Sequence, residues 1–134
     1  MQDVFACDIA PCRVIIADDV DDIREMVRFW LDGVDDEFLI VGEAADGVEA
    51  IVAAETHQPD AIILDLSMPK MDGLSAIAEI RRRSPDSKIL VMSGFDSTVM
   101  SSKALQLGAD AYVEKGTGFN ELTRVLRRLC DQAA

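Results

Sequence analysis

Short apolar runs alternate with longer amphipathic stretches along the whole chain. The runs have the length of strands, and their centres, such as residues 14–16 and 62–64, are continuously apolar rather than alternating with polar residues. Runs of this kind are typical of parallel strands that are buried on both faces of a sheet. We therefore expect strands at residues 13–17, 38–44, 61–65, 88–93 and 111–114.

The stretches between these runs have the periodicity of helices. The first places one apolar stripe at helical spacing, which predicts that Trp30 is a core residue. In the last, arginines alternate with an apolar face, and Gly108 is a plausible C-terminal stop for the helix before it. We expect helices at residues 21–31, 47–56, 73–83, 97–107 and 119–130. Strands and helices alternating five times indicate an α/β fold, a doubly wound parallel sheet with helices on both faces.

The length of 134 residues fits one domain. We interpret residues 13–130 as that domain, residues 1–12 as an N-terminal extension and residues 131–134 as a C-terminal tail or linker remnant. No window approaches the roughly 18 uninterrupted apolar residues of a membrane-spanning helix. The first residues carry acids but no Lys or Arg, which is the wrong charge for a secretory signal. We expect a soluble, cytoplasmic protein.

Charge and cysteine content limit the possible partners. The formal net charge of -12 has the same sign as DNA and anionic lipid, so we expect proteins or cations as partners and no direct contact with nucleic acid or membrane. Cys7, Cys12 and Cys130 contain no Cys-x-x-Cys pair and are odd in number. Neither a zinc site nor a disulfide framework is therefore indicated, and a reducing cytoplasm suits them.

Polar side chains collect where the predicted strands end. Asp18 and Asp19 follow the first strand, Asp65 ends the third, Ser93 ends the fourth and Lys115 follows the fifth. Ligands of doubly wound sheets bind beyond the carboxyl ends of the strands, so these side chains should share one site. Carboxylates held close together repel unless a cation lies among them, and an all-oxygen site suits Mg²⁺.

The residues at these strand ends resemble the receiver domains of bacterial two-component response regulators. The resemblance spans about residues 13–129 and is carried by four motifs in order, at residues 14–19, 64–73, 92–94 and 112–115. Residues 57–93 look most like receivers attached to helix-turn-helix DNA-binding domains. The resemblance implies a flavodoxin-like strand order of 2-1-3-4-5, as in the chemotaxis regulator. It leaves open whether the chain is a piece of a longer transcription regulator or stands alone.

The resemblance also assigns roles to the site residues. It makes Asp65 the nucleophile that takes a phosphoryl group from a sensor histidine kinase or a small phosphodonor. Asp19, Asp65 and the backbone carbonyl of Ser67 would hold Mg²⁺, with Asp18 contacting it directly or through water. Phosphoryl transfer needs mainly alignment and charge neutralisation, so no separate general base is required. We expect no enzymatic activity beyond self-phosphorylation and self-dephosphorylation.

The resemblance implies a switch as well. Phosphorylation adds roughly 1.5 to 2 negative charges at one point. Lys115 would pair with one phosphoryl oxygen, and the Ser93 hydroxyl would donate to another and draw Tyr112 inward. The face made by the fourth helix, fifth strand and fifth helix would then repack, and an output domain or a second copy would dock there. Alternatively, Tyr112 is a static, half-buried ring.

Three competing functions share parts of this pattern. A flavodoxin-like electron carrier needs a Gly-, Ser- or Thr-rich phosphate cradle after the first strand, where this chain has acids. An aspartyl-phosphate phosphatase needs a general acid where Ser67 stands. The third is a receiver fold that binds partners without phosphorylation. The presence of all the residues needed for phosphoryl acceptance argues against it.

One residue departs from the family pattern: Gly116 follows Lys115, where many receiver domains have a proline.

Overall fold

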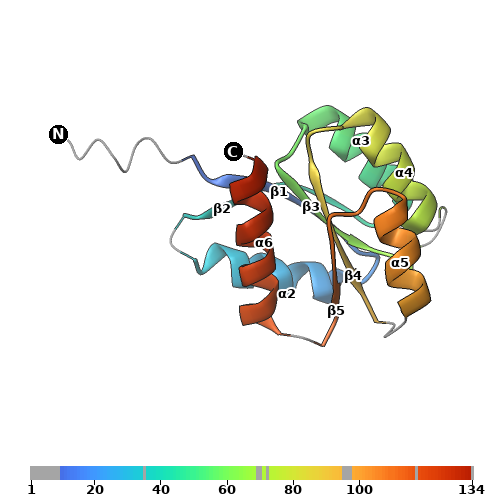
Figure 1. The fold of residues 1–134 in the computed structure, drawn as a ribbon. Coiled ribbons are helices and arrows are strands. Elements are labelled where there is room, and N and C mark those ends of the chain that lie inside the picture. Colours follow the sequence, from blue (N-terminus) through green and yellow to red (C-terminus); the bar gives the residue numbers. More distant parts are fainter. Residues whose placement is uncertain are drawn as a thin grey trace.

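The computed structural model describes residues 10–34, 36–68, 71, 73–94, 98–116 and 118–133. Within these residues, strands and helices alternate along the chain as the sequence predicts (Figure 1). The elements are β1 (Cys12–Ala17), α2 (Asp21–Asp32), β2 (Phe38–Ala44), α3 (Gly47–His57), β3 (Ala61–Asp65), α4 (Gly73–Arg83), β4 (Lys88–Ser93), α5 (Thr98–Gln106), β5 (Ala111–Glu114) and α6 (Phe119–Ala133).

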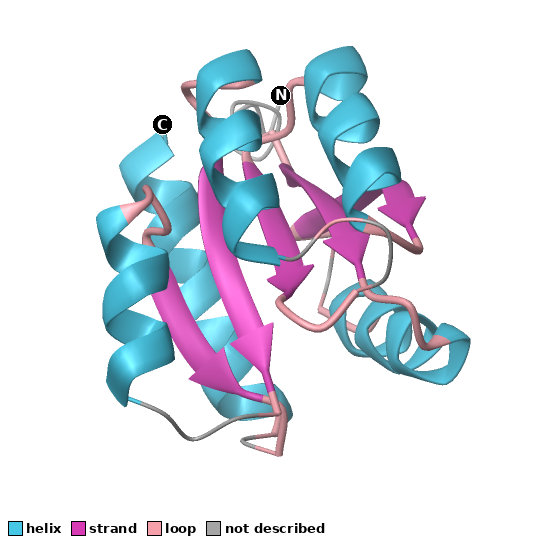
Figure 2. Cartoon of the chain, turned by 90° about the vertical axis from the view of Figure 1, so that its right-hand side faces the viewer, coloured by secondary structure: helices cyan, strands magenta, loops and turns pink. Residues whose placement is uncertain are grey.

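The strands form one parallel sheet in the order β2-β1-β3-β4-β5, and neighbouring arrows in Figure 2 point the same way. The register pairs Ala17 with Leu64, and Ser93 with Glu114. The carboxyl ends of β1, β3, β4 and β5 therefore reach the same edge of the sheet. The strand order implied by the resemblance is confirmed.

Helices cover both faces of the sheet. Ile15 belongs to the core that α3, α4 and α5 cover, whereas Val14 and Ile16 belong to the core that α2 and α6 cover (Figure 1). Successive side chains of a strand point to opposite faces, so a strand between two helical layers needs apolar residues at every position. This explains why the central runs are continuously apolar.

Local signals fix two of the helix ends. Asp46 caps α3 by accepting a hydrogen bond from the Glu49 backbone at 2.8 Å, and the Glu49 carboxylate accepts one from the Ala45 backbone at 2.9 Å. After α5, Gly108 has a φ of 119°, a left-handed conformation that glycine adopts at no steric cost. The Ala109 amide donates to the Ala104 carbonyl at 3.0 Å, which closes the helix as predicted.

The predicted domain boundaries need correction at both ends. Cys12 is the first residue of β1, paired in register with Phe38, so it is not part of an N-terminal extension. At the other end, α6 continues to Ala133, so residues 131–133 are helical rather than a tail. Residues 1–9 and 134 lie outside the described part of the chain.

The prediction that Trp30 is a core residue needs a smaller correction. Trp30 is half-buried, packs against the core beneath α2 and α6, and contacts Phe119 in a tilted arrangement with ring centroids 5.8 Å apart. Met26, from the same predicted stripe, is 38% exposed. The stripe is wider than the surface available to bury it, so its edge residues stay partly in solvent.

The expectation of no disulfide is wrong. Cys12 and Cys130 form a disulfide with their Cα atoms 6.0 Å apart, within the usual range for this bond. The two residues lie 118 positions apart in the sequence, so rules based on local cysteine spacing could not pair them. Cys7 lies outside the described residues.

Among the residues described, no helix is both long and apolar enough to span a membrane.

Candidate functional site

The loop after β1 places one buried and one exposed carboxylate at the edge of the sheet. Asp18 is 1% exposed, whereas Asp19 is exposed. Oδ1 of Asp18 accepts a hydrogen bond from the Val20 backbone amide at 2.9 Å, a local turn that short acidic side chains favour. This bond fixes the carboxylate and leaves its second oxygen, Oδ2, free to face another group.

The loop after β3 uses the same local device. Asp65 is 2% exposed, and its Oδ1 accepts a hydrogen bond from the Ser67 backbone amide at 3.1 Å. Gly73, the first residue of α4, holds this loop close, because a Cβ there would lie 2.5 Å from Cα of Leu66. A side chain at position 73 would therefore push α4 away from the loop that carries Asp65.

Lys115 links the two buried carboxylates. Its backbone amide donates to the Ser93 carbonyl at 2.8 Å, which fixes the start of the loop after β5. Its Nζ lies 2.9 Å from Oδ2 of Asp18 and 3.3 Å from Oδ2 of Asp65. Neither Oδ2 atom has another hydrogen-bond partner among the described residues. One ammonium thus compensates two buried carboxylates.

The three aspartates fit a small divalent cation. Asp18, Asp19 and Asp65 each offer a carboxylate oxygen, and these oxygens lie within 4.8 Å of one another. Mg²⁺ takes carboxylate oxygens together with water at about 2.0–2.1 Å, so two ligands of one ion lie at most about 4.2 Å apart, and these oxygens need only a small inward movement to share an ion. The buried Oδ2 atoms of Asp18 and Asp65, which share one ammonium and have no other hydrogen-bond donor among the described residues, are the strongest sign that a cation belongs here.

Burial and charge shift the pKa values at this site. Burial raises the pKa of Asp65, and the nearby charge of Asp18 adds to the rise, while the Ser67 amide and Lys115 oppose it. For Lys115, burial works against the charged form, but the contacts with Asp18 and Asp65 outweigh it and raise its pKa. Lys115 therefore stays charged at neutral pH.

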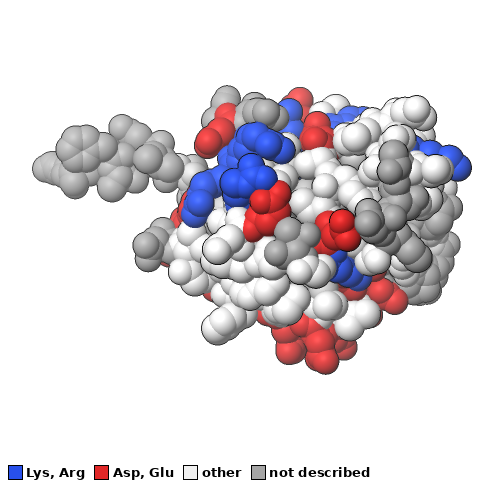
Figure 3. Space-filling view, turned by 60° about the horizontal axis from the view of Figure 1, so that its bottom comes forward, with Lys and Arg blue, Asp and Glu red and all other residues white. Residues whose placement is uncertain are grey.

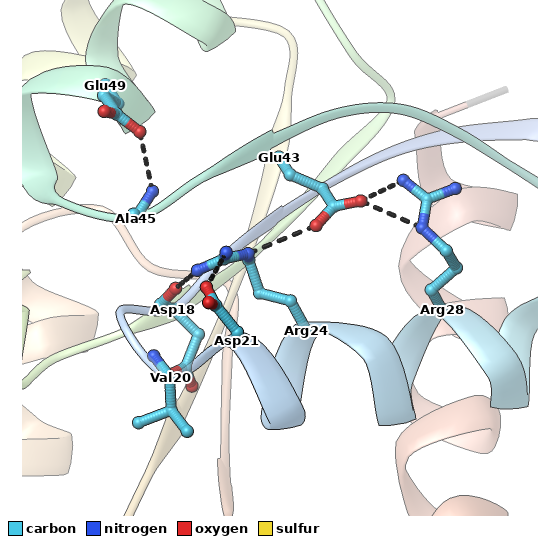
Figure 4. Close-up of polar contacts among 8 residues, drawn as sticks. All are labelled: Asp18, Val20, Asp21, Arg24, Arg28, Glu43, Ala45 and Glu49. Carbon is cyan, nitrogen blue, oxygen red and sulfur yellow. Dashed lines mark hydrogen bonds and ion pairs between the residues drawn. The ribbon is translucent and has the colours of Figure 1, made fainter.

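Arg24 is a site residue that the sequence analysis missed. Its guanidinium donates to the backbone carbonyl of Asp18 at 2.5 Å and also binds Asp21 (Figure 4). Glu43 on β2 holds it from the other side, with Nε of Arg24 at 3.2 Å from Oε1, and Glu43 also binds Arg28. The Arg24 side chain is only 15% exposed. Its position in the first turn of the helix after the acidic pair is the one signal that could have indicated it.

Ser93 and Tyr112, the predicted switch pair, lie on neighbouring strands. Ser93 is fully buried, and Tyr112 is half-buried and packs against the core beneath α3, α4 and α5. Val91 belongs to that same core and pairs in register with Tyr112. Because side chains two positions apart share a face, Ser93 lies on the same face of the sheet as Tyr112.

The structure describes only some of the remaining residues of the predicted motifs. Ser67 lies two residues beyond Asp65 with an exposed side chain, and the metal-binding role of its carbonyl stays a prediction. Pro69, Lys70 and Asp72 of the motif lie outside the described residues, as does the loop at residues 95–97. Figure 3 shows a group of acidic side chains and a separate group of basic ones on one face of the molecule.

A parallel sheet of order 2-1-3-4-5 with buried aspartates and a lysine at its carboxyl edge has the arrangement of a signal-receiver domain. The family model described as "Response regulator receiver domain" matches residues 14–127. The chain belongs to this family, as its resemblance predicted.

Similar curated proteins support this family assignment. The chain is 39% identical over 112 residues to the transcriptional regulatory protein YhcZ of Bacillus subtilis, covering 84% of this chain and 52% of that protein. It is 38% identical over 118 residues to the transcriptional regulatory protein PdtaR of Mycobacterium tuberculosis, covering 84% and 53%. The chain thus spans about half the length of the curated relatives it matches.

Solved structures show the same fold. The signal receiver domain of the response regulator NarL from Mycobacterium tuberculosis superimposes with a TM-score of 0.83 at 30% identity. The match covers 90% of this chain and 97% of that domain.

Proposed function

We propose that this receiver domain takes a phosphoryl group onto Asp65 from a phosphohistidine of a sensor histidine kinase. The observation that carries the proposal is the pair of buried Oδ2 atoms on Asp18 and Asp65, which share Lys115 and lack any other described hydrogen-bond partner. An ion pair with only a structural role would not need two carboxylates for one ammonium. A site that accepts a metal ion needs the additional negative charge, and one that accepts a phosphoryl group needs the ammonium.

The donor set supports Mg²⁺ as the cofactor, held by Asp18, Asp19, Asp65 and the Ser67 carbonyl. When bound, it supplies positive charge that offsets the phosphoryl oxygens. The Asp65 carboxylate attacks phosphorus, the bond from phosphorus to the histidine nitrogen breaks, and the imidazole leaves with the electron pair. The product is an acyl phosphate on Asp65.

The side chains around Asp65 position the group rather than exchange protons with it. The Ser67 amide holds the carboxylate in place, and Lys115, already at 3.3 Å, pairs with a phosphoryl oxygen once the group is attached. Ser93 donates its hydroxyl to another oxygen. We infer no enzymatic activity beyond this self-phosphorylation and the loss of the group by hydrolysis.

The switch runs from Ser93 to Tyr112 on the same face of the sheet. Movement of the half-buried Tyr112 repacks the face made by α5, β5 and α6. Val99 on α5 is 63% exposed, and Leu105 and Leu107 at its end are also exposed, so α5 offers apolar area to a partner. The partner is an output domain or a second copy of the chain. The curated relatives are about twice as long and are transcriptional regulators, which favours an output domain.

The working compartment is the cytoplasm, where such kinases present their phosphohistidine. The net charge of -12 disfavours direct binding of this chain to nucleic acid or to anionic membranes.

Acetyl phosphate with Mg²⁺ tests the proposal without the kinase. Intact-mass measurement should find one added phosphoryl group on the parent protein and none on Asp65→Asn. Asp86→Asn, an exposed acid in the loop before β4, is the matched control and should be phosphorylated like the parent. An unmodified parent, under conditions where the Mg²⁺ site is filled, would favour a receiver fold that binds partners without phosphorylation.

A further inference from the structure

The disulfide between Cys12 and Cys130 lies at the end of the sheet opposite the acidic pocket. Cys12 begins β1, and Asp18 follows the other end of the same strand. Cys130 lies in the last turn of α6, whose inner face packs on the sheet through Leu122, Leu126 and Leu129. The bond therefore ties the end of α6 to the beginning of the sheet.

The two sulfur atoms differ in access. Cys12 is buried, at 9% exposure, whereas Cys130 is partly exposed. A thiol or disulfide from solution can approach the pair at Cys130. Exchange at one accessible sulfur, followed by attack from a buried partner, is the usual route by which protein dithiols are oxidised and reduced.

Contacts other than the disulfide hold the two cysteines together. The Cys12 amide donates to the Glu37 carbonyl at 2.9 Å. The Glu37 carboxylate binds the guanidinium of Arg127, one turn before Cys130, with Nη2 of Arg127 at 2.8 Å from Oε1 of Glu37. Neither contact involves a sulfur atom, so we expect both to hold the thiols close together when the bond is cut and to allow it to form again.

We propose that Cys12 and Cys130 form a reversible redox modification site that exchanges with low-molecular-weight disulfides and thiols. The Cys130 thiolate attacks a donor disulfide RSSR and releases one RSH. The Cys12 thiolate then attacks the mixed disulfide at Cys130, forms the Cys12–Cys130 bond and releases the second RSH. Two electrons and two protons pass from the protein to the donor, and two RSH molecules reverse the reaction.

The bond acts on stability rather than on the acidic pocket. It closes a loop between residues 118 positions apart and so restricts the unfolded chain, which favours the folded state. It also keeps the end of α6 on the sheet. The length of β1 separates it from Asp18, so phosphoryl acceptance should be the same in both redox states. The proposal does not rest on the proposed function of Asp65.

Thiol labelling and thermal melts test the proposal on the same samples. The protein is equilibrated with oxidised or reduced glutathione, blocked with N-ethylmaleimide in denaturant so that buried thiols also react, and weighed intact. Since the chain has three cysteines, the oxidised protein should take one label, at Cys7, and the reduced protein three. Calorimetry should place the melting temperature of the reduced protein lower by on the order of 10 °C.

Three variants separate this pair from other effects. Cys12→Ser and Cys130→Ser should each melt at the same temperature in both glutathione forms, whereas Cys7→Ser should keep the full difference. Three labels on the oxidised parent, or equal melting temperatures of its two forms, would overturn the proposal. So would a disulfide-linked dimer on non-reducing electrophoresis in place of the internal bond. If a serine variant fails to fold, the labelling and melts of the parent and of Cys7→Ser decide.

Discussion

The Nζ atom of Lys115 lies 2.9 Å from Oδ2 of Asp18, a carboxylate that is almost fully buried. The same ammonium lies 3.3 Å from Oδ2 of Asp65. The site without metal therefore holds two buried negative charges against one positive charge. This imbalance favours the binding of a cation, and it makes Lys115 important for stability when no cation is present.

Replacing Lys115 with Met should destabilise the metal-free protein. The loss should be about 2 kcal/mol, below the usual cost of breaking a buried pair, because the Lys115 side chain is 25% exposed and water can replace part of the contact. Urea unfolding in the presence of chelator measures it. Lys103→Met, at an exposed position on α5, is the control. A loss no larger than that of the control would mean that Lys115 does not compensate the two aspartates.

Asp19→Asn should weaken the stabilisation by Mg²⁺. A ligand that binds only the folded state raises its stability by mass action, so removing one metal ligand should reduce the rise in melting temperature at millimolar Mg²⁺. Because Asp19 is exposed, the metal-free stability should change by less than about 0.5 kcal/mol. Asp22→Asn removes the same charge one turn away. Equal Mg²⁺ shifts in both variants would show that the ion does not bind at Asp19.

Asp65→Asn should raise the stability of the metal-free protein at pH 7. Burial raises the pKa of Asp65 above its unfolded value, so its contribution to stability is present at low pH and is lost as pH rises through the folded pKa. The asparagine variant has no proton to lose. Its gain should be about 1 kcal/mol at pH 7. The gain should shrink as the pH falls toward about 4, where the unfolded carboxyl also takes up a proton.

Chemical denaturation at several pH values, with chelator present, measures this difference. A gain that stays constant with pH would contradict the assigned pKa shift, since the effect would then come from packing rather than from charge.

Arg24→Gln should reduce Mg²⁺ affinity without removing a metal ligand. Arg24 holds the backbone carbonyl of Asp18 and is itself held by Glu43, so we expect it to position the loop that carries the ligands. Outer contacts of this kind change metal affinity by about 10-fold or more. Arg28→Gln is a matched control, because Arg28 binds Glu43 but makes no described contact with Asp18. Titration with Mg²⁺ below the melting temperature should show weaker Mg²⁺ binding by Arg24→Gln than by Arg28→Gln. Equal affinities would mean that Arg24 does not position the loop that carries the metal ligands.

The sequence predicted the central strands well because burial on both faces leaves an unbroken apolar run, as at residues 61–65 and 88–93. The edge strands at residues 38–44 and 111–114 also match the prediction residue for residue, although each is partly exposed. The site residues were predictable for a related reason. A parallel sheet brings all its carboxyl ends to one edge, so Asp18, Asp65 and Lys115 meet without any knowledge of the loops between them.

What the sequence could not indicate depends on contacts between distant positions. Cys12 and Cys130 meet only because α6 packs back across the sheet, and no local spacing rule detects such a pair. Arg24 has the composition of an ordinary surface residue, and its role depends on Glu43 facing it from a neighbouring strand. The partial exposure of Trp30 likewise depends on how much of α2 the sheet and α6 cover.

The most direct test of the central claim locates the phosphoryl group on the chain. Treating the phosphorylated protein with sodium borohydride reduces an aspartyl phosphate to homoserine, and tandem mass spectrometry of peptides then identifies the converted residue. We predict homoserine at position 65, formed only when both acetyl phosphate and Mg²⁺ were present. Conversion at Asp18 or Asp19, or a phosphoryl group on Ser93 with Asp65 unchanged, would contradict the account.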